Sequence, residues 1–139
     1  MWPLGSSQSN RKGIKVELKD KVAIVTGGAS GIGKATAAAM ARLGAQVAVV
    51  DVNEEDARNV ASDIGAISVV CDVGNEQSVN DMVDAVESQL GAVDVLFNNA
   101  GVATGGGPLD TSLDVWQSQW EVNVMAHIYA IRAVLPSML

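Results

Sequence analysis

Three glycines at short intervals, Gly27, Gly31 and Gly33, lie in the segment TGGASGIG of residues 26–33. A glycine has no Cβ atom, so the backbone N–H groups around it can come close to a bound anion. The apolar run 22–26 precedes the segment and a run with helical spacing follows it, which predicts a strand-to-helix turn. Backbone N–H groups at the start of a helix attract phosphate, so the segment predicts a site for the pyrophosphate of a dinucleotide. The alternative is an ordinary glycine-rich turn.

A carboxylate stands where such a site needs one, because Asp51 follows a second apolar run and lies eighteen residues after Gly33. At that place it can accept hydrogen bonds from the ribose hydroxyls of adenosine, and it would repel a 2′-phosphate. No basic residue occupies the next six positions, and Ser30 rather than Arg or Lys precedes Gly31. The pattern therefore favours NAD over NADP. The alternative is that Asp51 only starts the next helix, although Asn53 is a more natural helix cap.

These groups need a scaffold that brings strand ends together. Short runs rich in Val, Ile and Ala alternate with segments whose apolar residues recur at helical spacing. This alternation is typical of an α/β protein with a parallel sheet covered on both faces. The predicted strands are 22–26, 46–50, 67–71 and 93–97. The predicted helices are 31–43, 54–64, a third that ends before Gly91, and a long one from about Ser112 after a glycine-rich loop.

The long predicted helix is apolar on nearly every side. Between residues 122 and 135 it has only three polar side chains, among them Asn123 and His127. Such a helix requires cover on more than one side, and we expect nothing in residues 1–139 to cover its second side. We expect His127 to be a packing residue. Trp116 and Trp120 form an i, i+4 aromatic pair, which we expect to pack rather than to contact a substrate.

Composition excludes several classes of function. Nine Lys and Arg against sixteen Asp and Glu give a formal net charge of -7, so no nucleic acid partner is expected. The single cysteine, Cys71, rules out an intramolecular disulfide and a zinc site of soft ligands, and we expect it to behave as a small hydrophobe in a cytoplasmic protein. No apolar run approaches the roughly 18 residues of a membrane span. Residues 1–19 are expected to form a flexible tail, and residues 20–139 one domain.

Five segments in order resemble the short-chain dehydrogenase/reductase family. They are TGGASGIG at 26–33, Asp51 after the second strand, CDV at 71–73, NNAG at 98–101 and VNV at 122–124. The resemblance covers about residues 20–139. It implies a Rossmann-like, doubly wound parallel sheet, expected here to stop after about four strands, in the order 3-2-1-4, and the long helix that follows. The domain is then an NAD-binding domain that is incomplete at its C-terminus.

The resemblance assigns cofactor contacts to residues at the strand ends. They are Thr26, Gly27, Ser30, Gly31, Ile32, Gly33, Asp51, Asp72, Val73, Asn98, Asn99, Ala100 and Gly101. In the family, the residue matching Asp72 bonds the adenine amino group, and the one matching Val73 contacts the ring through its backbone. The NNAG segment braces the fourth strand and lines the cofactor near its nicotinamide side. The alternatives are a helix cap for Asp72 and a plain turn for NNAG.

The resemblance also says where proton transfer would come from. In the family a tyrosine transfers the proton, a lysine four residues later lowers its pKa, a serine orients the oxygen, and an asparagine matching Asn123 holds a water. Tyr129 is followed four residues on by Ala133 rather than lysine, and Ser137 lies too near Asn123 to be the family's serine. We therefore expect the cofactor-binding half of an NAD-dependent oxidoreductase acting on an alcohol or carbonyl. It would be inactive alone and would take substrate only if the missing half is supplied.

Two other functions stay open at this point. The first is a catalytically inactive dinucleotide-binding or interaction module. The second is a methyltransferase on a similar fold, which the NNAG and VNV segments weaken because that chemistry does not need them. In either case the open edge of the fourth strand and the apolar long helix predict a homo-oligomer or an aggregation-prone chain.

Overall fold

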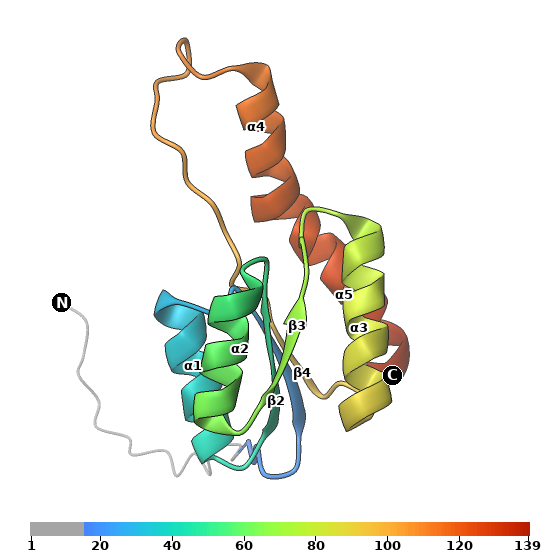
Figure 1. Cartoon of the computed structure of the whole chain (residues 1–139). Helices are drawn as coiled ribbons and strands as arrows, with labels where there is room; N and C mark the ends of the chain where they lie inside the picture. The colour runs from blue at the N-terminus through green and yellow to red at the C-terminus, as the bar shows by residue number, and fades with distance from the viewer. Residues whose placement is uncertain (1–15) are drawn as a thin grey trace, which may run out of the picture.

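The computed structural model describes residues 16–139, so the predicted tail of residues 1–19 lies almost wholly outside the described part. One parallel sheet forms the centre of that part, in the order β3-β2-β1-β4 (Figure 1). Its strands are β1 (Val22–Thr26), β2 (Gln46–Asp51), β3 (Ile67–Val70) and β4 (Val95–Phe97). The predicted α/β class, the parallel sheet and the strand order 3-2-1-4 are confirmed.

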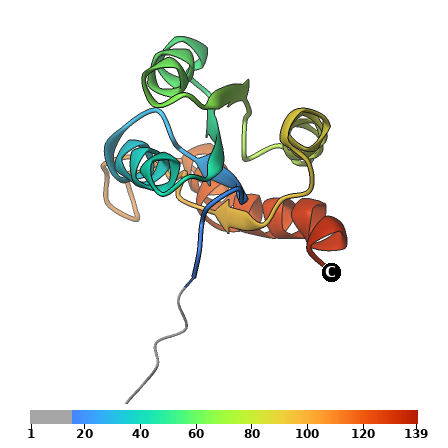
Figure 2. The same ribbon diagram turned by 90° about the horizontal axis from the view of Figure 1, so that it is seen from below.

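Helices cover both faces of this sheet. Helices α1 (Gly31–Arg42) and α2 (Glu54–Ile64) lie on one side, and α3 (Glu76–Leu90) and α5 (Ala126–Met138) on the other (Figure 2). All five residues of β1 are buried, and successive side chains point to opposite faces: Ile24 packs towards α3 and α5, and Val25 towards α1 and α2. The sheet is therefore doubly wound. Within residues 16–139 the structure has no helix long and apolar enough to cross a membrane.

Side-chain caps set the starts of three helices but not of α1. Asn53, Asn75 and Ser112 each accept a backbone N–H three residues later, at 3.1, 2.9 and 3.4 Å, and so begin α2, α3 and α4 (Leu113–Trp120). Ser30 is at the same place before α1, yet its side chain makes no cap hydrogen bond. The start of α1 thus differs from the other three.

The long predicted helix is divided into three segments. Helix α4 is followed by a single π-helical turn, η1 (Glu121–Met125), and then by α5. Pro136 lies inside the last turn of α5, which continues to Met138. A π-turn adds one residue to a helical turn and is frequently found at functional sites. Here the π-turn contains Asn123.

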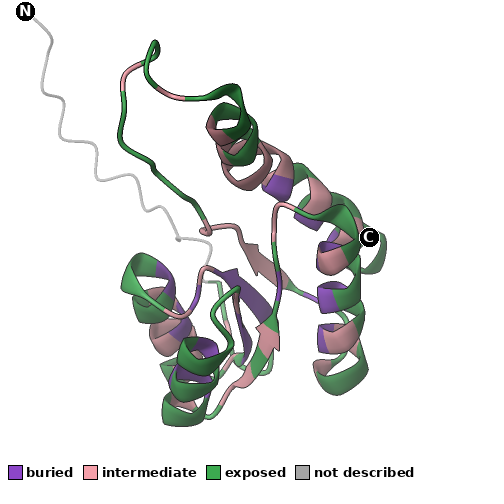
Figure 3. Cartoon of the chain, turned by 45° about the horizontal axis from the view of Figure 1, so that its top comes forward, coloured by how far each residue is buried: buried purple, intermediate pink, exposed green. Residues whose placement is uncertain are grey.

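Within the described residues the second side of this long segment is uncovered, as expected, but the packing expected for its two tryptophans is not found. Helix α4 buries none of its residues, and Trp116 and Trp120 are 50% and 54% exposed. Helix α5 buries one face, through Ala126, Ala130 and Val134, and leaves Ile128, Ile131 and Leu135 exposed (Figure 3). The physical reason is that α3 and the sheet contact only one side of α5, and α4 projects beyond the sheet.

Candidate functional site

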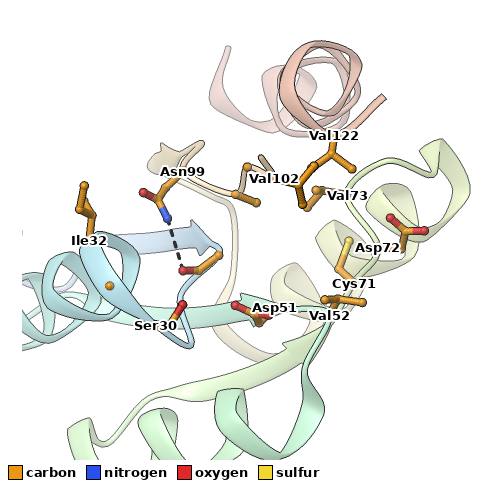
Figure 4. A pocket seen from close by; sticks show the side chains of 14 residues that line it. Ser30, Ile32, Asp51, Val52, Cys71, Asp72, Val73, Asn99, Val102 and Val122 are labelled. Atoms are coloured by element: carbon orange, nitrogen blue, oxygen red, sulfur yellow. Dashed lines mark hydrogen bonds between the residues drawn. The ribbon is translucent and has the colours of Figure 1, made fainter. Parts of the chain in front are cut away.

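A cavity of about 560 Å³ opens where the strands end (Figure 4). Its walls are formed by residues at or just after the ends of the four strands, by the first residues of α1 and by one residue from η1. They are Gly27, Ser30, Gly31, Ile32, Asp51, Val52, Cys71, Asp72, Val73, Asn99, Ala100, Gly101, Val102 and Val122. In open α/β sheets, ligands bind at the carboxyl ends of the strands where the strand order reverses, which here is between β1 and β4. The cavity is within the size range of small-molecule sites.

Glycine is required at the back of the turn between β1 and α1. A Cβ atom at position 33 would lie 2.1 Å from the carbonyl oxygen of Gly27 and 2.6 Å from Nδ2 of Asn99. Gly27 itself has a φ of +62°, and a Cβ there would lie 2.9 Å from Cα of Ala100. Any side chain at position 33 would therefore force α1 away from the turn.

The front of the same turn is open. A Cβ atom at Gly31 would meet nothing within 4 Å, and its φ of +52° is one that L side chains rarely adopt. No acidic residue stands in the first turn of α1, and Ser30 leaves the helix start without a side-chain cap. The first N–H groups of a helix have no partner within the helix, and they carry its positive end. The start of α1 fits an anion of the size and charge of a pyrophosphate.

Hydrogen bonds from the NNAG segment close the back of the site. The N–H groups of Asn99 and Ala100 donate to Oγ1 of Thr26, at 3.0 and 3.1 Å. Nδ2 of Asn99 donates to the carbonyl oxygens of Thr26 and Gly27, at 3.1 and 3.3 Å. Thr26 is 2% exposed and does not line the cavity, and neither does Asn98. The segment after β4 is thus held against the end of β1.

Two backbone groups orient the carboxylate of Asp51. Oδ2 accepts the N–H of Ala29 at 3.1 Å, and Oδ1 accepts the N–H of Asn53 at 3.1 Å. Asn53, not Asp51, caps α2. Each carboxylate oxygen has a second lone pair and can accept a further hydrogen bond from a ligand hydroxyl. Asp51 is therefore placed at the cavity rather than used as a helix cap.

The end of β3 supplies a mixed wall. Oδ1 of Asp72 accepts the N–H of Gly74 at 3.0 Å, and Asn75 rather than Asp72 caps α3. Cys71 is buried, and this burial raises the pKa of its thiol. A thiol with a raised pKa is a poor nucleophile, so Cys71 behaves here as the predicted small hydrophobe.

Asn123 joins η1 to the segment after β4. Its Oδ1 accepts the N–H of Val102 at 2.9 Å, and its Nδ2 donates to the carbonyl oxygen of Val102 at 2.8 Å. Tyr129 lies outside the cavity lining and donates to Oε2 of Glu121 at 3.1 Å. Burial raises the pKa of Tyr129, and its hydrogen bond to the Glu121 carboxylate raises it further. The amide of Asn123 therefore has a structural task in the site, and Tyr129 has none there.

Three valines of the lining were not predicted, in contrast to Ile32, Val73 and Ala100. Val52, Val102 and Val122 line the cavity, and an exposed valine such as Val52, which is 71% exposed, has no polar group to signal a ligand. The sequence signal for these three valines is their position, because each is adjacent to a predicted site residue: Asp51, Gly101 or Asn123. The described residues contain no cluster of His, Cys, Asp and Glu that could hold a metal ion. The site thus combines a helix start, an oriented carboxylate and apolar walls.

Comparisons with known proteins agree with this arrangement. A family model described as short chain dehydrogenase matches residues 21–139. The chain is 39% identical over 129 residues to short chain aldehyde dehydrogenase 1 of Euphorbia lathyris, covering 86% of this chain and 45% of that protein. It thus spans about half the length of the curated relatives it matches.

Two solved structures are similar in fold as well as in sequence. A hydroxysteroid dehydrogenase from Escherichia coli has a TM-score of 0.82 and 36% identity, over 88% of this chain and 52% of that chain. A short chain dehydrogenase/reductase from Burkholderia phymatum, solved in complex with NAD, has a TM-score of 0.86 and 37% identity, over 90% of this chain and 46% of that chain.

Proposed function

Since this chain belongs to the short chain dehydrogenase family, we propose that it forms the NAD-binding half of an oxidoreductase acting on an alcohol or carbonyl group. When bound, NAD would supply the nicotinamide carbon that exchanges a hydride with the substrate. The chain's own task is to hold and orient that cofactor. The observation that carries the proposal is the oriented carboxylate of Asp51 beside the open, uncapped start of α1.

Each part of the dinucleotide has a place in this proposal. The pyrophosphate lies at Ser30, Gly31 and Ile32, where unpaired N–H groups begin α1. The adenosine ribose bonds Asp51, whose negative charge disfavours the 2′-phosphate of NADP. The NAD complex of the Burkholderia phymatum relative supports a nicotinamide dinucleotide.

The remaining residues act at the two ends of the cofactor or behind it. The adenine lies against Asp72 and Val73, and the nicotinamide side against Asn99, Ala100 and Gly101. Thr26, Gly27, Gly33 and Asn98 shape the turn and the strand ends from behind. In this proposal Asn123 is the single member of the family's catalytic set among residues 1–139, where it would orient a water of the proton relay.

The first test is a calorimetric titration of the 139-residue chain with NAD and with NADP. We expect NAD to bind at least about tenfold more tightly than NADP. Asp51→Ala should weaken NAD binding about tenfold to a hundredfold, because a hydrogen bond to a charged group contributes about 1.5–3 kcal/mol. It should also reduce the ratio between the NADP and NAD dissociation constants. Asp63→Ala, at an exposed acid of α2 away from the cavity, is the control for lost charge. Equal affinities for both nucleotides in the original chain would overturn the ribose assignment.

Turnover is the second test, and it separates an enzyme half from an inactive binding module. We expect a folded chain of residues 1–139 to bind NAD without forming NADH in the presence of simple alcohols, because proton transfer contributes typically 10²–10⁴ in rate and the family's Tyr and Lys have no match here. NADH formation measured at 340 nm would contradict this. A cytoplasmic location and self-association of the chain are further predictions of the proposed function.

A further inference from the structure

The π-turn η1 lies between two walls of the cavity and contacts both. On one side Asn123 holds the backbone of Val102 by two hydrogen bonds, at 2.9 and 2.8 Å. On the other side the loop after β3 comes close at Gly74, where a Cβ atom would lie 3.3 Å from Cγ2 of Val122 and 3.5 Å from Cβ of Glu121. Val122 also lines the cavity itself. One helical turn thus separates the wall made by the end of β3 from the wall made by the end of β4.

The close approach of Val122 explains why position 74 is a glycine. The backbone conformation does not, because φ of Gly74 is not positive. Six other glycines of the described chain have positive φ, and Gly74 is not among them. An alanine could therefore adopt the backbone conformation of Gly74. What limits the position is space, because Val122 and Oδ1 of Asp72 would each be 3.3 Å from an added Cβ. Gly74 lets η1 approach the loop closely.

The same loop carries a proposed cofactor contact. The N–H of Gly74 donates to Oδ1 of Asp72 at 3.0 Å, so a shift of Gly74 moves the carboxylate with it. Across the cavity, Val102 follows directly after the NNAG segment. A displacement of η1 therefore acts on both walls at once.

We propose that η1 is a spacer that sets the width of the cavity. The contact between Gly74 and Val122 fixes one wall, and the clamp of Asn123 on Val102 fixes the other, so the two walls move together. Val122 and Gly74 are then positioning residues for the two ends of a dinucleotide. The role in positioning a dinucleotide rests on the proposed function, but the mechanical link between the two walls does not.

Amide hydrogen exchange in the cofactor-free chain tests the link directly. Gly74→Ala places a methyl group against Val122, which should displace η1 and weaken the hydrogen bond from the Val102 N–H. We expect exchange at Val102 to become about tenfold faster, since exchange reports local opening. Val122→Ala makes room for the new methyl group, so the double variant should exchange at about the rate of Val122→Ala alone. An unchanged Val102 rate in Gly74→Ala, or effects that simply add in the double variant, would overturn the spacer.

Two controls keep the result interpretable. Gly105→Ala adds the same methyl group where nothing lies within 4 Å, and exchange at Val102 should not change. Asn123→Ala releases the opposite wall and should speed exchange at the N–H of Gly74. This reciprocal effect tests the spacer even if Gly74→Ala loses its fold by far-UV circular dichroism. Unchanged exchange at Gly74 in a folded Asn123→Ala chain would count against the proposal.

NAD titration of the same variants connects the spacer to binding. Gly74→Ala should weaken NAD binding about threefold to tenfold, and the added Val122→Ala should restore most of the loss. If the original chain binds no NAD while the exchange pattern holds, the proposed function fails and the spacer stands. If NAD binds and the exchange pattern is absent, the spacer fails and the proposed function stands.

Discussion

The turn between β1 and α1 is packed and hydrogen-bonded from behind, whereas the segment from α4 to α5 is exposed on its outer side. Every residue of β1 is buried, and the turn after it is held by Thr26, Asn99 and the close packing of Gly33. In contrast, α4 buries no residue and exposes two tryptophans among the described residues. The described residues thus brace the turn at the cavity from behind, whereas they leave the outer face of the long segment uncovered. Binding and association should therefore respond to different substitutions.

The largest effect is expected at the back of the turn. Gly33→Ala places a methyl carbon 2.1 Å from a backbone oxygen. Overpacking typically lowers the free energy of unfolding by about 1–3 kcal/mol, and so close an approach should give a loss of about 3 kcal/mol or more. NAD binding should fall below detection because the start of α1 moves. Urea unfolding and calorimetric titration measure the two effects. Gly105→Ala is the control, because it adds the same methyl group at a glycine without positive φ where nothing lies within 4 Å. A Gly33→Ala chain that binds NAD normally would contradict the geometry.

A smaller loss of stability and of NAD binding is expected when the buried hydroxyl of Thr26 is removed. Thr26→Val leaves the N–H groups of Asn99 and Ala100 without their acceptor, and an unsatisfied buried donor costs about 1–3 kcal/mol. We expect the free energy of unfolding to fall by about 2 kcal/mol and NAD binding to weaken. Thr26→Ser keeps the hydroxyl and should recover most of the binding. Equal affinities in the Val and Ser variants would show that the brace does not support the site.

Substitutions on α4 should sharpen the contrast by leaving the binding site intact. Replacing Trp116 and Trp120 with Gln should change the free energy of unfolding by less than about 0.5 kcal/mol, as surface substitutions usually do. NAD affinity should be unchanged, while self-association measured by sedimentation velocity should decrease, because large exposed apolar patches promote association. Ser118→Gln on the same helix is the control. Loss of NAD affinity in the tryptophan variant would contradict the prediction that α4 and the cavity act independently.

The smallest effect concerns pH and the far end of the sheet. The hydrogen bond from Nζ of Lys21 and the one from the N–H of Val22 hold the pKa of Asp94 below its ordinary value. Because the folded-state pKa is lower than the unfolded one, these bonds stabilise the fold above about pH 4 and are lost as pH falls through the folded value. Thermal unfolding between pH 5 and pH 3 should therefore be less pH-dependent in Asp94→Asn and in Lys21→Met. NAD binding at neutral pH should not change. Wild-type pH dependence in both variants would exclude this role.

The sheet was predictable from local patterns, and its boundaries were less so. Apolar runs and their spacing indicated each strand, and the order followed from the resemblance. The fourth strand begins at Val95 rather than at Val93. Just before it, the carboxylate of Asp94 accepts the N–H of Val22, the first residue of β1. That contact joins residues 72 positions apart. No local pattern contains it.

The site was predictable where polar residues follow strands. Asp51, Asp72 and the NNAG segment all lie at the end of a strand, and parallel strands end at one edge of a sheet. The interruption of the long helix was not predictable, since the π-turn accompanies a bond between Asn123 and a backbone 21 residues earlier. The half-exposure of Trp120 was missed for a related reason. An apolar pattern predicts that another surface covers the helix, but it does not say whether that surface belongs to residues 16–139.

The brace between Thr26 and the segment after β4 also sets the order in which the site is completed during synthesis. Its hydrogen bonds join residues 73 and 74 positions apart, so loop closure must precede them. A ribosome releases β1 and the glycine turn long before Asn99 and Ala100 have left the exit tunnel. The nascent chain therefore carries a glycine turn with no back wall until Asn99 and Ala100 have emerged, and under the proposed function cofactor binding would follow that point.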